Sequence, residues 1–494
     1  MTDLVNPYNE DDHSSQSSGS SSSTSQTLRK EETKDRKAHP PRSKCPTISP
    51  RNMLLRLEKY NKNAKTKSPD EPKEKDIKKP EEEDKNKSLY VVSREFVDIL
   101  ADATGNTEDS TEDSDSLGSD LQEIIDSPSA EKNKKLKNKL KELENVTLNI
   151  AITGMTGAGK SSFVNALRGV SNNDKSAAST GTIETTMKPN MYQHPFMPNV
   201  KIWDLPGIGS LKFKAKQYLK DVNFHTYDFF LIVTSERFRE NDMKLARAIK
   251  KSKKLFYFIR TKIDNDIGAE SHKTNFDERM LLEKIREHYE ENLLKVGNPK
   301  IFLVSSFHLE KYDFPKLVNT LEEELPDNKK FALIQSLPVY SLEALTKKKT
   351  YFKKLIWLNA FAAGLGAIAP IPGLSLVCDY FIIEKFFQQV FLGFGLSNQA
   401  LEALSERVNK PVEQLKAAKT SRFKDGATEH IVIDMLSIPT IAIAKTLGTV
   451  MALLPGGGLP AGGTAVACVH YLLNTGLNEM AEDTRCILSV LELA

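Results

Sequence analysis

The chain has 494 residues, of which 39% are hydrophobic and 27% are charged. This length predicts about two or three domains, and the composition supplies enough apolar side chains for a sizeable core. The 69 Lys and Arg residues nearly balance the 66 Asp and Glu residues, which argues against a protein that coats nucleic acid. The four cysteines lie far apart in the chain, which argues against a disulfide scaffold and a cysteine-based zinc module.

The N-terminal region, residues 1–87, is rich in Ser, Lys, Glu and Pro and poor in aromatic residues. Such a segment buries too little apolar surface to offset the entropy of the chain, so we expect a disordered tail. Its first residues, Met1–Asp11, are polar and acidic, so we expect no secretory signal peptide. Together with the widely spaced cysteines, this predicts a cytoplasmic protein.

Order is expected to begin within residues 88–145. Near the end of this segment, Leu136, Leu140 and Leu143 recur at helical spacing and share one face of a Lys-rich helix over Ala130–Glu144. We predict that the segment packs against a helical domain formed by the C-terminal part of the chain.

Residues 146–326 alternate between short apolar runs and helical patterns, which is typical of a parallel sheet with crossover helices. The predicted fold class of this part is therefore α/β. The predicted strands are Leu148–Thr153, Val200–Asp204, Asp228–Thr234, Leu255–Thr261 and Lys300–Ser305. The helical patterns between them include Ser161–Arg168, Met243–Lys250 and Glu278–Leu294.

The first predicted strand leads directly into a GxxxxGK[ST] motif, which begins at Gly154 and ends at Ser161. The glycines of this motif let backbone N–H groups surround a phosphate at a helix N-terminus. Lys160 is expected to reach the β- and γ-phosphates, and the Ser161 hydroxyl is expected to bind Mg²⁺. The residues predicted to bind nucleotide here are Gly154, Thr156, Gly157, Ala158, Gly159, Lys160, Ser161 and Ser162.

A DxxG motif, from Asp204 to Gly207, stands at the end of the second predicted strand. An aspartate there holds Mg²⁺ through a water molecule, and the backbone N–H of Gly207 donates to the γ-phosphate. On its own DxxG is a common turn. Its position after a phosphate-binding loop favours a nucleotide site.

A TKxD motif, with Thr261, Lys262 and Asp264, follows the fourth predicted strand. A carboxylate at Asp264 accepts hydrogen bonds from N1 and the exocyclic amine of guanine, whereas adenine presents an acceptor at N1. The stem of Lys262 can lie over the base. The three motifs in this order predict GTP or GDP, with Mg²⁺, as the bound nucleotide. Ser305 and Ser306, after the last strand, are expected to complete the base pocket.

A Thr-rich segment, 180–186, lies between the first two motifs. A GTPase needs a threonine here whose hydroxyl and carbonyl meet Mg²⁺ and the γ-phosphate. Spacing does not choose among Thr180, Thr182, Thr185 and Thr186. The candidate metal ligands are Ser161, Thr180, Thr186 and Asp204.

The residue that follows DxxG is also informative. Small GTPases usually orient the attacking water with a glutamine just after this motif. The residue here is Ile208, which has no polar side-chain group. We therefore expect either slow hydrolysis or another group that positions the water, such as one supplied by a second copy of the chain.

Several long runs resemble the immunity-related GTPases of the interferon-inducible p47 type. They are GMTGAGKSSFVNALRGV, TGTIETTMKP, WDLPGIG, YDFF and FYFIRTKIDND, which start at Gly154, Thr180, Trp203, Tyr227 and Phe256. These contiguous matches are far more specific than the generic GTPase motifs, and they are strongest over residues 146–358.

The resemblance implies a Ras-like P-loop G domain and an all-α helical domain built from segments on both sides of it. It implies GTP-dependent self-association through the G domains and a role for Glu184 in the assisted hydrolysis. Peripheral association with internal membranes and cell-autonomous immune defence are further expectations. Because Lys160 is present, the chain is similar to the GKS branch of the family. The predicted catalytic residues are Lys160, Ser161 and Glu184.

Residues 327–494 show no strand pattern, and we predict helices broken by Gly and Pro. Two stretches within them, Ile356–Cys378 and Thr446–Val469, carry no charge. Three interpretations stay open: helices buried in a soluble bundle, a hairpin that inserts in a membrane, and a transmembrane pair. The prolines and glycines within the stretches favour the first.

Two classes of function fit these patterns. The favoured one is an enzyme, a self-assembling GTPase that acts at an internal membrane in immune defence. The alternative is a scaffold that binds GTP without useful turnover, or a tissue-restricted GTPase without an immune role. An ATP-driven P-loop motor is disfavoured by Asp264.

Overall fold

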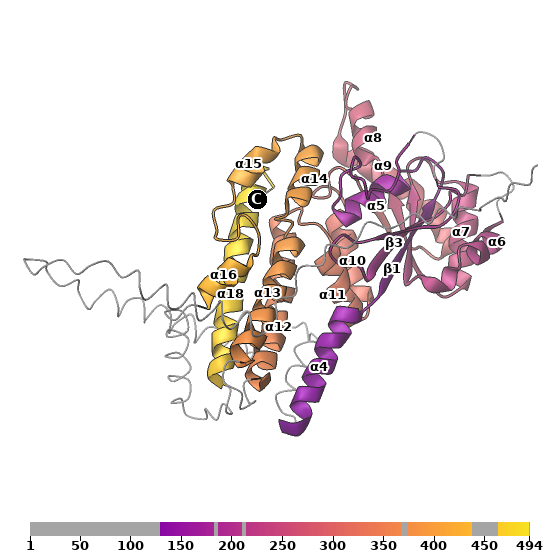
Figure 1. Cartoon of the computed structure of the whole chain (residues 1–494). Helices are drawn as coiled ribbons and strands as arrows, with labels where there is room; N and C mark the ends of the chain where they lie inside the picture. The colour runs from indigo at the N-terminus through magenta and orange to yellow at the C-terminus, as the bar shows by residue number, and fades with distance from the viewer. Residues whose placement is uncertain (1–128, 182–185, 210–213, 367–373, 437–462, 494) are drawn as a thin grey trace, which may run out of the picture. The chain divides into compact units, whose positions relative to one another are not determined.

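Residues 146–326 contain one sheet flanked by helices (Figure 1). It has six strands, in the order β2-β3-β1-β4-β5-β6. The strands are β1 (Leu148–Gly154), β2 (Asn190–Gln193), β3 (Val200–Asp204), β4 (Phe229–Thr234), β5 (Leu255–Arg260) and β6 (Ile301–Leu303). Neighbouring strands are parallel except β2, which pairs antiparallel with β3 at one edge. The predicted α/β fold class is confirmed.

This computed structural model describes residues 129–181, 186–209, 214–366, 374–436 and 463–493. All of these belong to one unit of the chain, residues 49–494. The predicted tail, residues 1–87, lies outside the described residues, as do Thr182, Glu184 and Thr185.

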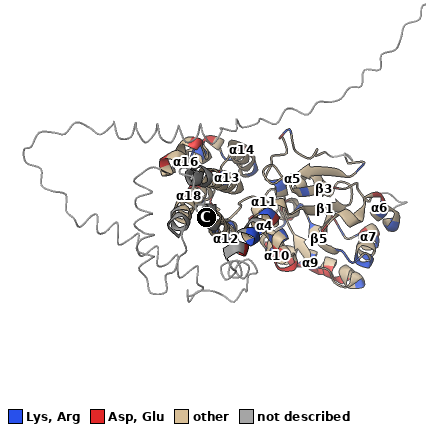
Figure 2. Ribbon diagram, turned by 60° about the horizontal axis from the view of Figure 1, so that its bottom comes forward, with Lys and Arg blue, Asp and Glu red and all other residues tan. Residues whose placement is uncertain are grey.

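Helices cover both faces of the sheet, because its strands are apolar on both sides. On β4, Phe229 and Leu231 face one core and Phe230 and Ile232 face the other, as the alternation of a strand requires. The first face is covered by α5 (Lys160–Arg168), α10 (Phe314–Glu324) and α11 (Asp327–Ser336). The second is covered by α6 (Ala215–Asp221), α7 (Glu240–Lys251) and α9 (Glu278–Leu293). Figure 2 shows charged positions on the helices, while the strands are mostly free of them.

All five predicted strands agree with the structure to within two residues at each end. The strand that the sequence did not predict is β2, whose residues Asn190–Gln193 include only two apolar side chains and lie at the sheet edge. A short helix, α8 (Ile263–Glu270), directly follows β5, and the one-turn 3₁₀ helices η1 (Phe224–Thr226) and η2 (Leu294–Val296) complete this part.

The remaining described elements are helices joined by loops. The helices are α4 (Ser129–Asn145), α12 (Leu342–Gly366), α13 (Leu374–Gly393), α14 (Asn398–Val408), α15 (Val412–Ala417), α16 (Glu429–Met435) and α18 (Gly463–Val490). The long helices α12, α13 and α18 pack against one another, and the ring of Phe352 on α12 meets Phe386 and Phe394 edge-on. Helix α4, which precedes the sheet, packs against α11 and α12, which follow it. The helical part is therefore built from segments on both sides of the sheet.

The two uncharged stretches are only partly described, since residues 367–373 and 437–462 lie outside the described residues. Their described portions belong to α12, α13 and α18. Among the helices that the structure describes, none combines the length and the hydropathy needed to cross a bilayer.

Candidate nucleotide-binding site

The loop between β1 and α5 has the geometry of a phosphate cradle. Gly154 has φ of 135°, and a Cβ atom there would lie 1.9 Å from the carbonyl oxygen of Val233, so only glycine fits. Lys160 is the first residue of α5, and its buried Nζ donates to the carbonyl of Met155 at 3.1 Å. The loop therefore wraps around the lysine ammonium at the N-terminus of a helix.

Three oxygen-bearing side chains converge beside this loop. Ser161 Oγ donates to Asp204 Oδ2 at 2.6 Å, and Thr186 Oγ1 donates to the same oxygen at 3.0 Å. Burial raises the pKa of Asp204, and the Ser161 hydroxyl, the Lys160 charge and the Thr186 hydroxyl oppose that shift. The other carboxylate oxygen, Oδ1, is buried and accepts no hydrogen bond from the described residues. Hard oxygen donors around an undersatisfied carboxylate fit a magnesium ion.

The TKxD segment lies directly against the phosphate loop. Thr261 Oγ1 donates to the carbonyl of Ala158 at 2.6 Å. Lys262 has φ of 61°, and its Nζ donates to the carbonyl of Gly157 at 2.9 Å. Asp264 is the second residue of α8, at the same edge of the sheet. The two sequence motifs thus form one continuous site.

This segment is stabilised by an ion pair that the motifs did not predict. Arg260, at the end of β5, is buried, and its Nη2 lies 2.5 Å from Asp266 Oδ2 on α8. Burial raises the pKa of Asp266, and the Arg260 charge lowers it. The pair joins the strand to the helix that carries Asp264.

The two serines predicted for the base pocket follow β6. Ser305 is buried, and its Oγ accepts from the backbone N–H of Phe307 at 3.2 Å; Ser306 is half-buried. The backbone N–H of Ile263 donates to the carbonyl of Val304, which joins this loop to the start of α8. The serines therefore lie in a loop attached to the TKxD segment.

A cavity of about 170 Å³ opens at this site. Its lining residues are Thr156, Gly157, Gly159, Lys160, Ser161, Ser162, Thr180, Gly181, Thr186, Gly207 and Lys262. Predicted site residues that do not line it are Gly154, Ala158, Asp204, Thr261, Asp264, Ser305 and Ser306. Of the two candidate switch threonines that the structure describes, Thr186 bonds to Asp204, whereas Thr180 lines the cavity without such a bond.

Two contacts that hold the DxxG segment carry no sequence signature. The Tyr218 hydroxyl on α6 lies 2.7 Å from Thr153 Oγ1 and donates to the carbonyl of Pro206 at 3.0 Å. Burial raises the pKa of this hydroxyl, so it stays protonated and able to donate. The Asn241 amide on α7 donates to the carbonyl of Ile208 at 2.9 Å. Only the folded arrangement of α6 and α7 reveals these residues.

Comparison with known proteins gives a consistent result. A family model described as "Interferon-inducible GTPase (IIGP)" matches residues 122–490. The chain is 39% identical over 355 residues to "Interferon-gamma-inducible GTPase 10" of Mus musculus, across 71% of this chain and 82% of that protein. It is 38% identical over 356 residues to "Interferon-inducible GTPase 5" of Rattus norvegicus, across 71% and 77%. It is 37% identical over 355 residues to "T-cell-specific guanine nucleotide triphosphate-binding protein 2" of Mus musculus, across 71% and 83%.

Proposed function

The chain belongs to the interferon-inducible GTPase family, and we propose that its copies self-assemble in order to hydrolyse GTP. Each copy binds GTP with Mg²⁺ at the site described above. The observation that carries the proposal is the double hydrogen bond that Asp204 Oδ2 accepts from Ser161 and Thr186. It joins the phosphate loop, the switch segment and the DxxG motif at one point.

Each part of the site has a role in this proposal. Ser161, Thr186 and Asp204 would hold Mg²⁺ between them, the aspartate through a water molecule. When bound, the ion neutralises charge on the β- and γ-phosphate oxygens, and Lys160 adds a second positive charge there. Asp264 selects guanine, because its carboxylate accepts from both donors on the guanine edge.

The water that attacks GTP needs a positioning group. Ile208 is fully buried and offers none, and its carbonyl is already bonded to Asn241. We propose that Glu184 contributes this group when two G domains pair, as the family resemblance implies. Hydrolysis then depends on assembly, because the isolated site is incomplete.

A turnover assay over a range of protein concentrations tests this function. We expect the specific activity of the full chain to rise with concentration, and that of Glu184→Gln to stay low throughout. Lys160→Ala should lose about 100-fold or more of turnover, because a positive charge that meets the transferring phosphate is removed. Lys175→Ala, which changes an exposed lysine outside the cavity, should retain turnover.

Two results would refute it. Equal turnover in the wild type and Lys160→Ala would contradict the enzyme hypothesis and favour the alternative, a scaffold that only binds GTP. A flat concentration series with normal turnover would remove the paired mechanism while leaving the GTPase.

We further propose that the chain acts in immune defence, since the relatives carry names such as interferon-inducible GTPase. We also propose that it acts at an internal membrane, as the family resemblance implies. Co-sedimentation with liposomes tests the membrane part. We expect sedimentation with GTP and little with GDP, because assembly multiplies weak contacts with the bilayer. Equal sedimentation in both nucleotides would contradict a nucleotide-gated attachment.

A further inference from the structure

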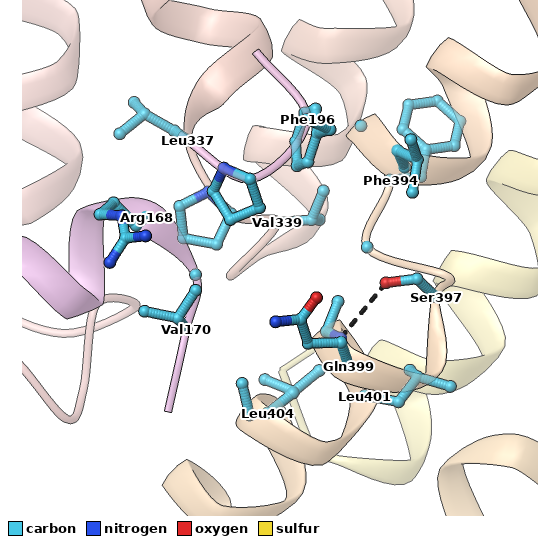
Figure 3. Close-up of a pocket in the computed structure, with 18 of the residues that line it drawn as sticks. Arg168, Val170, Phe196, Leu337, Val339, Phe394, Ser397, Gln399, Leu401 and Leu404 are labelled. Atoms are coloured by element: carbon cyan, nitrogen blue, oxygen red, sulfur yellow. Dashed lines mark hydrogen bonds between the residues drawn. The ribbon is translucent and has the colours of Figure 1, made fainter. Parts of the chain in front are cut away.

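Two features of the described residues lie outside the nucleotide site. The first is a mostly apolar cavity of about 190 Å³ between the end of α5 and α14 (Figure 3). Its two arginines already face negative groups of the chain itself. The charge of Asp174 acts on Arg168, which also donates to two backbone carbonyls at 2.9 and 3.1 Å. The charge of Glu310 acts on Arg407.

A histidine in the same wall adds no charge. His194 is only 2% exposed, and burial together with the charges of Lys348 and Arg168 lowers its pKa to about 3, so the ring is neutral. The walls therefore specify no ligand, and we assign none to this cavity.

The second feature is a surface with uncompensated positive charge, which we call the basic surface. It consists of four exposed side chains: Arg247 and Lys251 on α7, Lys253 in the loop before β5, and Lys295 on η2. None of the four forms an ion pair or a side-chain hydrogen bond with the described residues. Their charge is therefore available to a partner.

One contact shows that these cations lie on adjoining segments. Lys250, at the end of α7, donates through its Nζ to the carbonyl of Val296 at 2.9 Å, which holds α7 against η2. Residues 243–258 contain no Asp or Glu, and Figure 2 shows Lys and Arg positions along α7. Glu290 and Glu291, at the end of α9, form no ion pair with these cations within the described part of the chain. Positive charge is thus concentrated here, although the whole chain is nearly balanced.

Exposed leucines accompany the cations. Leu294, next to Lys295, is 65% exposed, and Leu255, two residues after Lys253, is exposed as well. Contacts between proteins favour Arg and are depleted in Lys, whereas lysine clusters beside apolar side chains suit anionic lipid headgroups. Because the surface has three lysines, one arginine and two leucines, it favours a membrane over an acidic protein.

The basic surface lies at the edge of the sheet opposite the nucleotide. The nucleotide-binding loops follow β1, β3 and β5, at the carboxyl ends of the strands. Lys253 and Lys295 precede the parallel strands β5 and β6, and so lie at the amino ends. None of the four residues lines the nucleotide cavity. Pairing of two G domains at their nucleotide sites therefore leaves this surface accessible.

We propose that the basic surface binds the anionic headgroups of a lipid bilayer, with Leu294 and Leu255 entering its interfacial region. This rests on the proposed action at a membrane and names the part of the chain that touches it. Each lysine near an anionic bilayer raises the affinity about fivefold. One copy therefore binds weakly, and an assembly binds firmly.

Titration of the full chain with vesicles, in GDP and again in GTP, tests the lipid class. Vesicles of phosphatidylcholine with about 30% phosphatidylserine should bind the wild type, and pure phosphatidylcholine should bind it at least tenfold more weakly. Inorganic phosphate should lower binding no more than sodium chloride of equal ionic strength, because the attraction is to a charged surface that salt screens. Stronger competition by phosphate would reveal a site for the free ion and overturn the lipid assignment.

A pair of double variants tests the cations. Lys251→Gln combined with Lys253→Gln should weaken binding to the anionic vesicles about 25-fold. Lys175→Gln combined with Lys424→Gln is the matched control, since it removes the same charge from exposed lysines elsewhere. GTP turnover without vesicles should be the same in both, which shows that the site and the assembly are intact.

The leucine has its own control on the same helical segment. Leu294→Gln should weaken binding about tenfold, because less apolar surface leaves water. Met280→Gln, at a side chain that is 58% exposed on the first turn of α9, should keep the wild-type affinity. Equal affinities of the lysine variant and its control would overturn the basic surface and leave action at a membrane in place. Absence of wild-type binding to either vesicle in both nucleotides would overturn both proposals.

Discussion

At Asp204, one carboxylate oxygen distinguishes the two candidate threonines of the switch segment that the structure describes. The Thr186 hydroxyl donates to Oδ2 at 3.0 Å, whereas Thr180 is exposed and makes no such bond. A hydrogen bond to a charged group is worth about 1.5–3 kcal/mol. We therefore expect Thr186→Ala to lower turnover by about 10- to 100-fold.

Thr180→Ala is the matched control, because it removes the same side chain from the same segment. Steady-state GTP hydrolysis at saturating Mg²⁺, and again at low Mg²⁺, separates lost chemistry from lost metal affinity. A larger loss in Thr180→Ala than in Thr186→Ala would contradict the assignment.

His194 predicts a loss of stability in mild acid. Its folded pKa of about 3 lies below the unfolded value of 6.5, so the unfolded chain binds more protons between these two pH values. Its contribution to stability is complete above pH 6.5 and falls as the pH drops towards 3. Each pH unit below 6.5 lowers the free energy of unfolding by about 1.4 kcal/mol, so the loss at pH 5 is about 2 kcal/mol.

Denaturant unfolding at pH 8 and pH 5 measures this effect. His194→Gln, which does not titrate, should show a smaller difference between the two pH values than the wild type. His272→Gln, at an exposed histidine, should keep the wild-type difference. An unchanged difference in His194→Gln would mean that the ring is not the group responsible.

The sequence was sufficient to predict site residues that belong to a local motif. It was not sufficient to predict residues whose role depends on how distant segments fold together. Ser161, Asp204 and Asp264 follow from the order of three motifs along the chain. The choice of Thr186 over Thr180 required the path of the switch segment beside Asp204. Tyr218 and His194 belong to no sequence motif. Their hydrogen-bond partners are either 65 or more residues away in the sequence or backbone carbonyls, which carry no sequence signal.

At the scale of elements, two helical glycines predict opposite effects of the same substitution. On α18, a Cβ at Gly476 would lie 2.3 Å from the ring of Phe387, which is fully buried on α13. Alanine favours a helix by about 1 kcal/mol, but overpacking costs about 1–3 kcal/mol, so Gly476→Ala should destabilise the protein. On α8, a Cβ at Gly268 meets nothing within 4 Å, so Gly268→Ala should stabilise it by about 0.5–1 kcal/mol.

Thermal unfolding of the two variants beside the wild type checks both signs. A higher unfolding temperature for Gly476→Ala would show that α13 and α18 separate easily. The contrast isolates packing, because the propensity change is the same in both helices.

Strands could be predicted from the sequence where both of their faces are buried. Strands such as β4 are buried at every position and apolar at all but the last, and the lengths of their apolar runs predicted their ends to within two residues. The edge strand β2 could not be found in this way, because Asn190 and Gln193 are polar and its pairing partner β3 lies later in the chain. The cavity between the end of α5 and α14 could not be predicted from the sequence either, because its walls come from residues that are distant in sequence.

At the scale of the whole molecule, the core beneath the sheet extends past residue 326. Leu333 and Ile334 of α11, and Leu337 after it, are buried in the same core as Phe163 and Leu231. Burial of each such side chain is worth about 1.5–3 kcal/mol. Their sum is comparable with the total stability of a domain, about 5–15 kcal/mol.

We therefore expect a fragment of residues 129–326 to be much less stable than a fragment of residues 129–341. Each kcal/mol shifts the unfolding temperature of a chain of this size by about 2–4 °C, so the shorter fragment should unfold at least 10 °C lower, or fail to fold. Circular dichroism melts and GDP titrations of both fragments measure the difference. Equal unfolding temperatures would mean that α11 only rests on the sheet, and that the helical part is attached to the nucleotide domain without sharing its core.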